Sequence, residues 1–252
     1  MAEISTSLTR PLPFELEALS RAKRYQSWIY DTVHPYLGRR ILELGSGVGN
    51  MSTWLPVREL LVLTETDPTF VKILKNKTIS HPMGHKIRVD SFDLSKDSYE
   101  KYFTDNFDTI ISFNVFEHIQ DDFKAMKEMS ELLRKSRAPG PRRLITFVPA
   151  HQWAYGGMDR TFGHYRRYTS ARAQQMKEFC SQGARLEWRY FNLLGLVGWV
   201  INGRLRGKSE IGLDTIEKFE AICPYIRGVD DWIHRVLALP LGQSLLFTLT
   251  WD

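Results

Sequence analysis

A chain of 252 residues, of which 43% are hydrophobic and 12% aromatic, is long enough for one large domain with a substantial core. The net charge of +5 and the pI near 9.1 permit anionic partners but do not indicate nucleic acid binding. Two cysteines exclude a disulfide framework and a cysteine-rich metal site. Residues 1–12 lack the apolar core of a secretory signal, and no apolar run approaches the ~20 residues of a membrane span, so a cytoplasmic protein is expected.

The first periodic segment lies near the N-terminus. Apolar residues at helical spacing, such as Ile29 and Val33, predict one amphipathic helix over residues 14–33. Pro13 suits the first turn of this helix, and Pro35 lies where it ends. A helix in this position packs against the sheet or closes over a bound ligand.

A glycine-rich turn follows the first apolar run, residues 40–44, which predicts the first strand of a nucleotide-binding α/β domain. Gly45, Gly47 and Gly49 are spaced G-x-G-x-G, whereas the dinucleotide-binding sequence is G-x-G-x-x-G. Glu43 precedes the turn, and its carboxylate would repel a diphosphate but suits a ligand that carries an ammonium and a sulfonium. The alternative interpretation is an ordinary strand-to-helix turn.

This turn resembles motif I of the class I S-adenosylmethionine (SAM)-dependent methyltransferases. The resemblance implies an α/β fold with a Rossmann-like seven-stranded sheet, mostly parallel with an antiparallel last strand, and helices on both faces. It also implies SAM as the cofactor, with S-adenosylhomocysteine as its product. In this family an N-terminal helix often closes over the cofactor, which makes Tyr25 a candidate contact. The turn itself provides the other candidate contacts of this region: Glu43, Gly45, Ser46, Gly47 and Gly49.

The second strand is predicted at residues 60–65, which are apolar on both faces, as buried parallel strands are. It ends in Glu65, Thr66 and Asp67. An acid in this position can accept hydrogen bonds from both ribose hydroxyls. The resemblance gives this role to Glu65, with Thr66 beside it. The alternative is that Asp67 caps the next helix and Glu65 points into solvent.

A short third strand is predicted at residues 86–89. In the family, an acid after this strand reaches the adenine amino group and the next residue offers its backbone. This favours Asp93 and Leu94 as adenine contacts, with Asp90 as the rival acid.

The fourth strand, residues 107–113, leads into a run that contains Asn114, Val115 and His118. The run resembles motif IV of the family, in the form found in ubiquinone and menaquinone biosynthesis methyltransferases. This implies that Asn114 and Val115 lie at the methionine end of the cofactor, while His118 lines the cofactor pocket or caps a helix. The Pro-Pro-aromatic and Pro-Cys signatures of DNA-methylating enzymes are missing, so a nucleic acid substrate is not expected.

The segment 149–168 follows the fifth strand, residues 144–149, and combines aromatic residues, histidines, arginines and glycines without a regular period. Long loops in compact domains are usually functional, and open α/β sheets bind ligands at the carboxyl ends of their strands. Similar runs occur in a bacterial methyltransferase subgroup often associated with surface-glycan or secondary-metabolite genes. The alternative is a structural loop whose arginines pair with carboxylates. The candidate substrate contacts are Trp153, Tyr155, Tyr165, Arg166 and Arg167.

Methyl transfer to a hydroxyl requires positioning, exclusion of water and a base, because SAM itself supplies the reactive methyl group. The histidines of the loop are favoured as the base, since neutral imidazole accepts protons near neutral pH. No carboxylate cluster indicates a metal site. The candidate catalytic residues are His164, His151, Asp159 and Tyr155.

The predicted organisation is an N-terminal helical lid, residues 1–38, and a methyltransferase domain, residues 39–252. The domain contains the substrate loop 149–168 and a helical insert at 192–240, and its last strand lies antiparallel between the fifth and sixth. The apolar run in this insert predicts a buried helix, a wall for an apolar substrate or a membrane-surface contact. The remaining elements are helices at 51–55, 68–74, 119–133 and 169–181, a strand at 186–191, helices within 193–201 and 204–240, and a strand at 243–251.

The predicted function is transfer of a methyl group from SAM to a small-molecule acceptor, with a hydroxyl of a natural-product, glycan or lipid-like intermediate as the expected target. One alternative is a SAM-binding protein that catalyses another reaction or none. A second is an NAD(P)-dependent oxidoreductase, which the glycine spacing and Glu43 disfavour. The sequence does not predict an oligomeric state.

Overall fold

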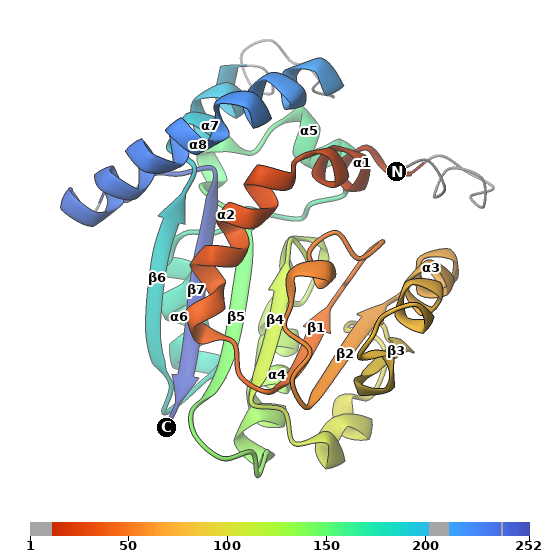
Figure 1. The fold of residues 1–252 in the computed structure, drawn as a ribbon. Helices are drawn as coiled ribbons and strands as arrows, with labels where there is room; N and C mark the ends of the chain where they lie inside the picture. Colours follow the sequence, from red (N-terminus) through yellow and green to blue (C-terminus); the bar gives the residue numbers. More distant parts are fainter. Residues whose placement is uncertain (1–11, 202–211, 238) are drawn as a thin grey trace.

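The computed structural model describes residues 12–201, 212–237 and 239–252 of the chain (Figure 1). Seven strands form one sheet in the order β3-β2-β1-β4-β5-β7-β6. β1 to β5 pair in parallel, and β7 lies antiparallel between β5 and β6, as predicted. The strands are β1 (Arg40–Leu44), β2 (Leu60–Glu65), β3 (Ile87–Ser91), β4 (Thr109–Phe113), β5 (Arg142–Pro149), β6 (Arg185–Phe191) and β7 (Ser244–Trp251).

Helices cover both faces of the sheet, and several gather at one end of it (Figure 1). One apolar core joins α4 and α6 to the first face, and a second joins α2, α3 and α8 to the other. The predicted Rossmann-like fold is therefore confirmed. The helices are α1 (Phe14–Arg21), α2 (Lys23–Val33), α3 (Pro68–Ile79), α4 (Asp122–Lys135), α5 (Gly157–Thr161), α6 (Ser170–Cys180), α7 (Leu193–Trp199) and α8 (Leu213–Val236).

The near-continuous apolar sequence of the strands follows from this two-sided burial. In β1, Leu42 and Leu44 belong to the core under α4 and α6, whereas Ile41 belongs to the core under α2 and α8. Successive side chains of a strand point to opposite faces, so both sets must be apolar when helices cover both faces. Among the buried residues of β1, Glu43 is the exception to this apolar pattern, and it lies just before the glycine turn.

The prediction of one N-terminal helix is wrong in detail, because the chain breaks at Ala22 into α1 and α2. Pro13 is the residue before α1 rather than part of its first turn. The break leaves the first N–H groups of α2 without helical partners. Glu220 of α8 accepts hydrogen bonds from the backbone N–H groups of Arg24 and Tyr25, at 2.8 and 2.9 Å. The start of α2 is thus stabilised by a residue 195 positions away, and the sequence near Ala22 does not predict it.

The prediction of a helix at residues 51–55 is also wrong, because only a short 3-10 turn, Ser52–Trp54, forms there. Pro56 follows two residues after this turn and cannot continue a helix. The helix after β2 is longer than predicted and ends at Ile79. Thr169 caps α6 as predicted, since its side chain accepts the N–H of Arg172.

The helical insert contains α7 and α8, which lie beyond the upper end of the sheet in Figure 1. α7 is only half buried: Leu196 and Trp199 face inward, while Leu194 and Val197 are 49% and 47% exposed. Part of the predicted insert, residues 202–211 and 238, lies outside the described residues. Within the described part of the chain, no helix combines the length and apolarity that crossing a membrane demands.

Asp122 is the centre of a buried ionic cluster that ties α4 to α6. Its carboxylate accepts hydrogen bonds from the Tyr168 hydroxyl and from Nη2 of Arg172, both at 2.7 Å, and Nη1 of Arg166 lies 3.3 Å away. We expect Asp122→Ala to lower the free energy of unfolding by roughly 2 kcal/mol, because it removes the acceptor of the buried Tyr168 hydroxyl and the counterion of two partly buried arginines. Urea unfolding followed by circular dichroism measures this change. Asp121→Asn is the control, since asparagine also caps a helix, and a loss equal to that of Asp122→Ala would contradict the prediction.

Candidate functional site

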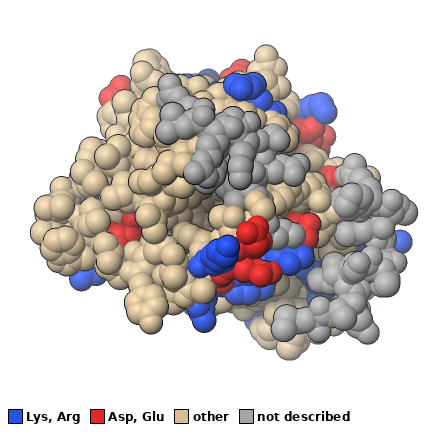
Figure 2. Space-filling view, turned by 90° about the horizontal axis from the view of Figure 1, so that it is seen from above, with Lys and Arg blue, Asp and Glu red and all other residues tan. Residues whose placement is uncertain are grey.

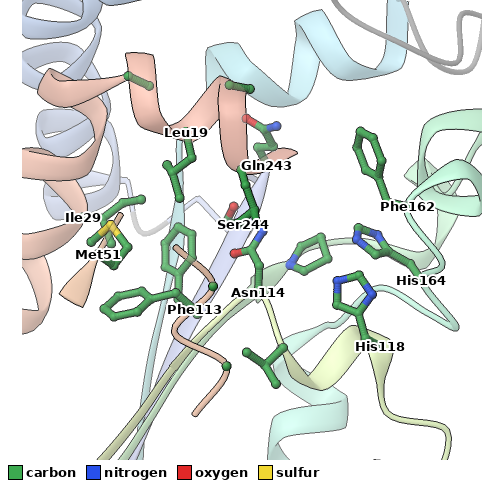
Figure 3. Close-up of a pocket in the computed structure, with 18 of the residues that line it drawn as sticks. Leu19, Ile29, Met51, Phe113, Asn114, His118, Phe162, His164, Gln243 and Ser244 are labelled. Atoms are coloured by element: carbon green, nitrogen blue, oxygen red, sulfur yellow. The ribbon is translucent and has the colours of Figure 1, made fainter. Parts of the chain in front are cut away.

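A cavity of about 1070 Å³ lies at the carboxyl ends of the central strands. Its floor comes from the ends of β1, β2 and β4, and its walls come from α1, α2, α7 and the segment after β5. Figure 3 shows side chains from these separate elements pointing into one space. Open α/β sheets bind ligands at this end, so the cavity is the candidate site.

The glycine turn forms the part of the floor next to β1. Gly45 has φ +63°, and a Cβ atom there would lie 2.6 Å from Cγ2 of Val115, so only glycine fits. Gly47 also has a positive φ, and its N–H donates a hydrogen bond of 2.7 Å to Oε2 of Glu65. Gly45 and Gly47 line the cavity, whereas Ser46 and Gly49 do not.

Glu65 ends β2, is buried and lines the cavity. Oε1 accepts the backbone N–H groups of Thr66 and Asp67 at 2.7 and 3.0 Å, which fixes the carboxylate at the rim of the floor. The alternative prediction is right about Asp67, which caps α3 by accepting the N–H of Thr69. It is wrong about Glu65, which is 9% exposed rather than solvated. Asp67 therefore caps a helix, whereas Glu65 faces the cavity. Thr66 lines the cavity beside Glu65.

Glu43 is buried and does not line the cavity, so the structure does not place it in the direct contact with the cofactor that we predicted. Its carboxylate accepts hydrogen bonds from the hydroxyls of Ser46 and Ser52, and so fastens both sides of the turn to β1. Burial raises the pKa of Glu43 to about 7, because loss of hydration outweighs the two hydroxyl donors. This carboxylate shapes the turn from below, which explains a charged residue in an otherwise apolar strand.

The raised pKa of Glu43 predicts a pH-dependent stability. The folded chain holds the proton more tightly than the unfolded chain, whose pKa is near 4.5, so the contribution of Glu43 to stability falls as pH rises from about 4.5 to about 7. Glu43→Gln cannot titrate. The unfolding free energy of the variant should therefore rise relative to wild type, by up to about 3 kcal/mol, between about pH 5 and pH 8. Urea unfolding at both pH values measures the difference, and a constant difference would contradict the assignment.

The region after β3 separates the two rival adenine contacts. Asp93 and Leu94 line the cavity. Asp90 does not; its carboxylate forms an ion pair with Arg88 at 3.0 Å. Of the two acids, only Asp93 can reach a ligand in this cavity.

The end of β4 places Asn114, Val115 and His118 on the cavity wall. Asn114 has φ +54°, a conformation that asparagine tolerates better than most residues, and its N–H donates to the carbonyl of Phe147 at 2.8 Å. Non-glycine residues in this conformation gather at functional sites. Tyr25 of α2 also lines the cavity. Burial raises the pKa of Tyr25 to about 12, so its hydroxyl is protonated near neutral pH.

The segment after β5 contains a 3-10 turn, Gln152–Ala154, and the short helix α5 rather than an irregular loop. Of its predicted site residues, His164 and Arg167 line the cavity. They are connected through Asp159, whose Oδ1 lies 2.9 Å from Nδ1 of His164 and 2.7 Å from Nε of Arg167. Burial alone would raise the pKa of Asp159, but the hydrogen bonds from these two partners lower it below its usual range. The ionised Asp159 therefore holds both side chains at the cavity wall without lining the cavity itself.

The other predicted loop residues do not line the cavity. His151 is buried against the ring of Tyr190, its Nε2 accepts the N–H of Gly242, and burial together with the charge of Arg167 lowers its pKa. The Tyr155 hydroxyl donates to the carbonyl of His164 at 2.7 Å, which is a positioning contact.

The three remaining substrate candidates also point elsewhere. Trp153 and Tyr165 are 48% and 54% exposed on the outer side of the segment. Arg166 donates hydrogen bonds to the carbonyls of Ile119 and Gln120 and neighbours Asp122, as in the structural alternative for the loop arginines.

Several residues that line the cavity were not among the predicted site residues. They are Phe162 of the loop, Ser244 at the start of β7, and Leu194, Val197 and Ile222 of α7 and α8. The last three are also 47–49% exposed, so the mouth of the cavity has an apolar rim. Figure 2 views the molecule from this side, and much of that face carries no charged side chains. The apolar run of α7 indicated such a wall as one of three alternatives, but α8 gave no hint of it.

Comparison with known proteins finds similarity to methyltransferases over part of the chain. Residues 21–138 match the family model of a methyltransferase domain. Methyltransferase GfsG of Streptomyces halstedii is 25% identical over 141 residues, which are 55% of this chain and 48% of GfsG, so the chain spans about half the length of that relative.

Two solved structures share the fold over most of the chain. The methyltransferase domain of the bacterial CtHen1-C matches with a TM-score of 0.57 and 12% identity, over 93% of this chain and 99% of that domain. The [4+2]-cyclase SpnF matches with a TM-score of 0.56 and 15% identity, over 89% of this chain and 80% of SpnF. Residues 21–138 are therefore similar to a methyltransferase domain, and the sheet as a whole shares its fold with these solved structures.

Proposed function

We propose that this chain transfers the methyl group of SAM to a hydroxyl of a largely apolar small molecule. The observation that carries the proposal is one cavity with two chemically different ends. One end has the glycine turn, Glu65 and Asp93, and the other has His118 and His164 beneath an apolar rim. A nucleoside cofactor suits the first end, and a separate acceptor suits the second.

In this proposal the cofactor extends from β2 to β4. The ribose hydroxyls donate to Glu65, whose carboxylate is already fixed by backbone N–H groups. Adenine lies at Asp93 and Leu94, and the methionine end lies at Asn114 and the turn. Tyr25 of α2 closes the cavity from above. In this arrangement the methyl group lies between the floor of the cavity and the wall formed by His118 and His164, here called the histidine wall.

The acceptor lies against His118 and His164, whose rings are 4.8 Å apart and nearly perpendicular. A lone pair of the acceptor oxygen forms the new O–C bond, while the S–C bond breaks and its electron pair returns to sulfur, which gives S-adenosylhomocysteine. The hydroxyl must lose its proton, so the histidine wall is where acceptor activation takes place. Wall and lid exclude water and align the two reactants.

The apolar rim supports a natural-product or lipid-like acceptor. Leu194 and Val197 of α7 are half exposed at the mouth, next to Phe162 and Trp199 on the inner wall. A glycan alone would leave these surfaces without a partner. A peripheral membrane contact through this rim is one route by which a lipid-like acceptor reaches the cavity.

A direct test incubates the purified chain with SAM and a panel of apolar alcohols and phenols, and measures S-adenosylhomocysteine by mass spectrometry. The proposal predicts acceptor-dependent release and a methyl ether product. Methylation of amines or carbon centres alone, with every hydroxyl acceptor inert, would contradict the hydroxyl assignment.

The alternative is a protein that binds SAM but catalyses another reaction. It is favoured by one observation, the shared fold with SpnF, which is described as a cyclase rather than a methyltransferase. The same panel separates the two functions, because the alternative predicts a product without release of S-adenosylhomocysteine.

A further inference from the structure

We infer that Glu117, His118 and His164 form a binding site for a divalent transition-metal ion in the wall of the cavity. One ligand atom from each residue lies within 4.8 Å of the other two. Metal–ligand bonds of about 2.0–2.2 Å place neighbouring ligand atoms roughly 3–4 Å apart. Side-chain shifts of about an ångström would bring the three ligand atoms to this spacing.

The backbone around these residues is already fixed. Glu117 and His118 belong to the 3-10 turn Phe116–His118 after β4, whereas His164 lies 46 residues later, after α5. Residues next to His164 tie the two segments together. The N–H of Tyr165 donates to the carbonyl of Glu117 at 2.8 Å, and Nη2 of Arg166 donates to the carbonyl of Gln120 at 2.7 Å. The site is thus assembled before any ion binds.

His164 has the environment of a metal ligand. Histidines that bind metals almost always donate the N–H of their other ring nitrogen to a carboxylate or carbonyl, which fixes the tautomer and the ring orientation. Nδ1 of His164 lies 2.9 Å from Oδ1 of Asp159, so Nε2 is the ring nitrogen that would bind the ion. Figure 3 shows the rings of His164 and His118 close together on the same wall of the cavity.

The donor set indicates the kind of ion. Two imidazoles and one carboxylate, with positions left for water or substrate, are typical of zinc and non-haem iron sites, whereas magnesium prefers oxygen ligands. Glu117 is buried, so its carboxylate would meet the ion within the protein rather than in solvent.

The role of the ion rests on the proposed function, although its binding does not. His118 and His164 line the cavity, so the ion faces the space assigned to the acceptor. A bound ion there would orient the acceptor oxygen and lower the pKa of its hydroxyl, whose proton would then pass to water at the mouth of the cavity. The histidine wall would act through the ion instead of taking the proton itself.

The test is metal binding by the tag-free full chain after treatment with a chelator. Titration with Zn²⁺ in a calorimeter and with Co²⁺ by visible absorption is expected to show one ion per chain, with Mg²⁺ binding much more weakly. His164→Ala and Glu117→Gln should each weaken Zn²⁺ binding at least 100-fold. Asp159→Asn should weaken it roughly 10–100-fold through the orientation of His164.

His85→Ala is the matched control, because His85 is exposed and lies far from the cluster in sequence, so its loss should leave Zn²⁺ binding unchanged. Circular dichroism of each variant shows that the fold is kept. If wild type binds no ion, or if Glu117→Gln and His164→Ala bind as wild type does, the inference is overturned.

The same experiments separate this inference from the proposed function. Metal binding by wild type that is lost in the variants, without methylation of any hydroxyl acceptor, supports the site and contradicts the function. Methylation by a wild-type protein that binds no ion contradicts the site and supports the function, and an equal rate in chelator-treated and metal-loaded protein contradicts the role given to the ion.

Discussion

Glu65→Ala is expected to weaken SAM binding by roughly 100-fold. The carboxylate is the group at the end of β2 that lines the cavity, and its oxygens are fixed by the N–H groups of Gly47 and Thr66. Hydrogen bonds from two ribose hydroxyls to a carboxylate are together worth about 3 kcal/mol, which corresponds to this loss. Isothermal titration calorimetry with SAM and with S-adenosylhomocysteine measures it.

Asp67→Asn is the matched control for Glu65→Ala. It removes a negative charge two residues away, while asparagine still caps α3. Its SAM affinity should stay within about threefold of wild type, since Asp67 does not line the cavity. Equal affinities for wild type and Glu65→Ala would show that the ribose lies elsewhere.

His164→Ala is expected to lower the single-turnover rate of methyl transfer by roughly 100–1000-fold, with little change in SAM affinity. The imidazole lies on the acceptor side of the cavity and is oriented by Asp159, so its loss removes the group that activates the hydroxyl. Rapid-quench measurement with SAM and the acceptor found in the panel gives the rate.

His151→Ala is the comparison for the second histidine of the loop. His151 is buried against Tyr190 and outside the cavity lining, so its loss should lower stability but slow the chemical step by less than about tenfold. If His151→Ala is slow and His164→Ala retains the wild-type rate, the acceptor side of the site has been assigned to the wrong wall.

The sheet could be predicted because its signals are local. The parallel strands β1, β2, β4 and β5 each contain a short apolar run, and the strands end near residues that line the cavity, as in β2 with Glu65 and β4 with Asn114. Both-face burial produces such runs without any knowledge of the fold. The resemblance to a known family supplied the order of the strands.

The break between α1 and α2 could not be predicted, because its cause lies far away in the chain. The helix pattern continues through Ala22, and the partner that stabilises the second start is Glu220 of α8. A hydrogen bond between residues 195 positions apart cannot be predicted from the residues that surround the helix start. The apolar rim of α8 escaped prediction for the same reason, since exposure is decided by packing.

The histidines of the loop show a different limit. His151 and His164 have the same chemistry and similar neighbours in sequence, and their roles were left open. Only the fold distinguishes them, because His164 lines the cavity, whereas His151 packs against the ring of Tyr190 in β6. Glu117 stood beside His118 in the sequence, but its proximity to His164 becomes visible only when the two segments meet.

A crystal structure of the chain with S-adenosylhomocysteine tests the proposed cofactor position most directly. We expect the ribose hydroxyls within hydrogen-bond distance of Glu65, the adenine at Asp93 and Leu94, and the sulfur facing the wall formed by His118 and His164. A nucleoside bound outside this cavity, or a Glu65 carboxylate turned into solvent, would contradict it.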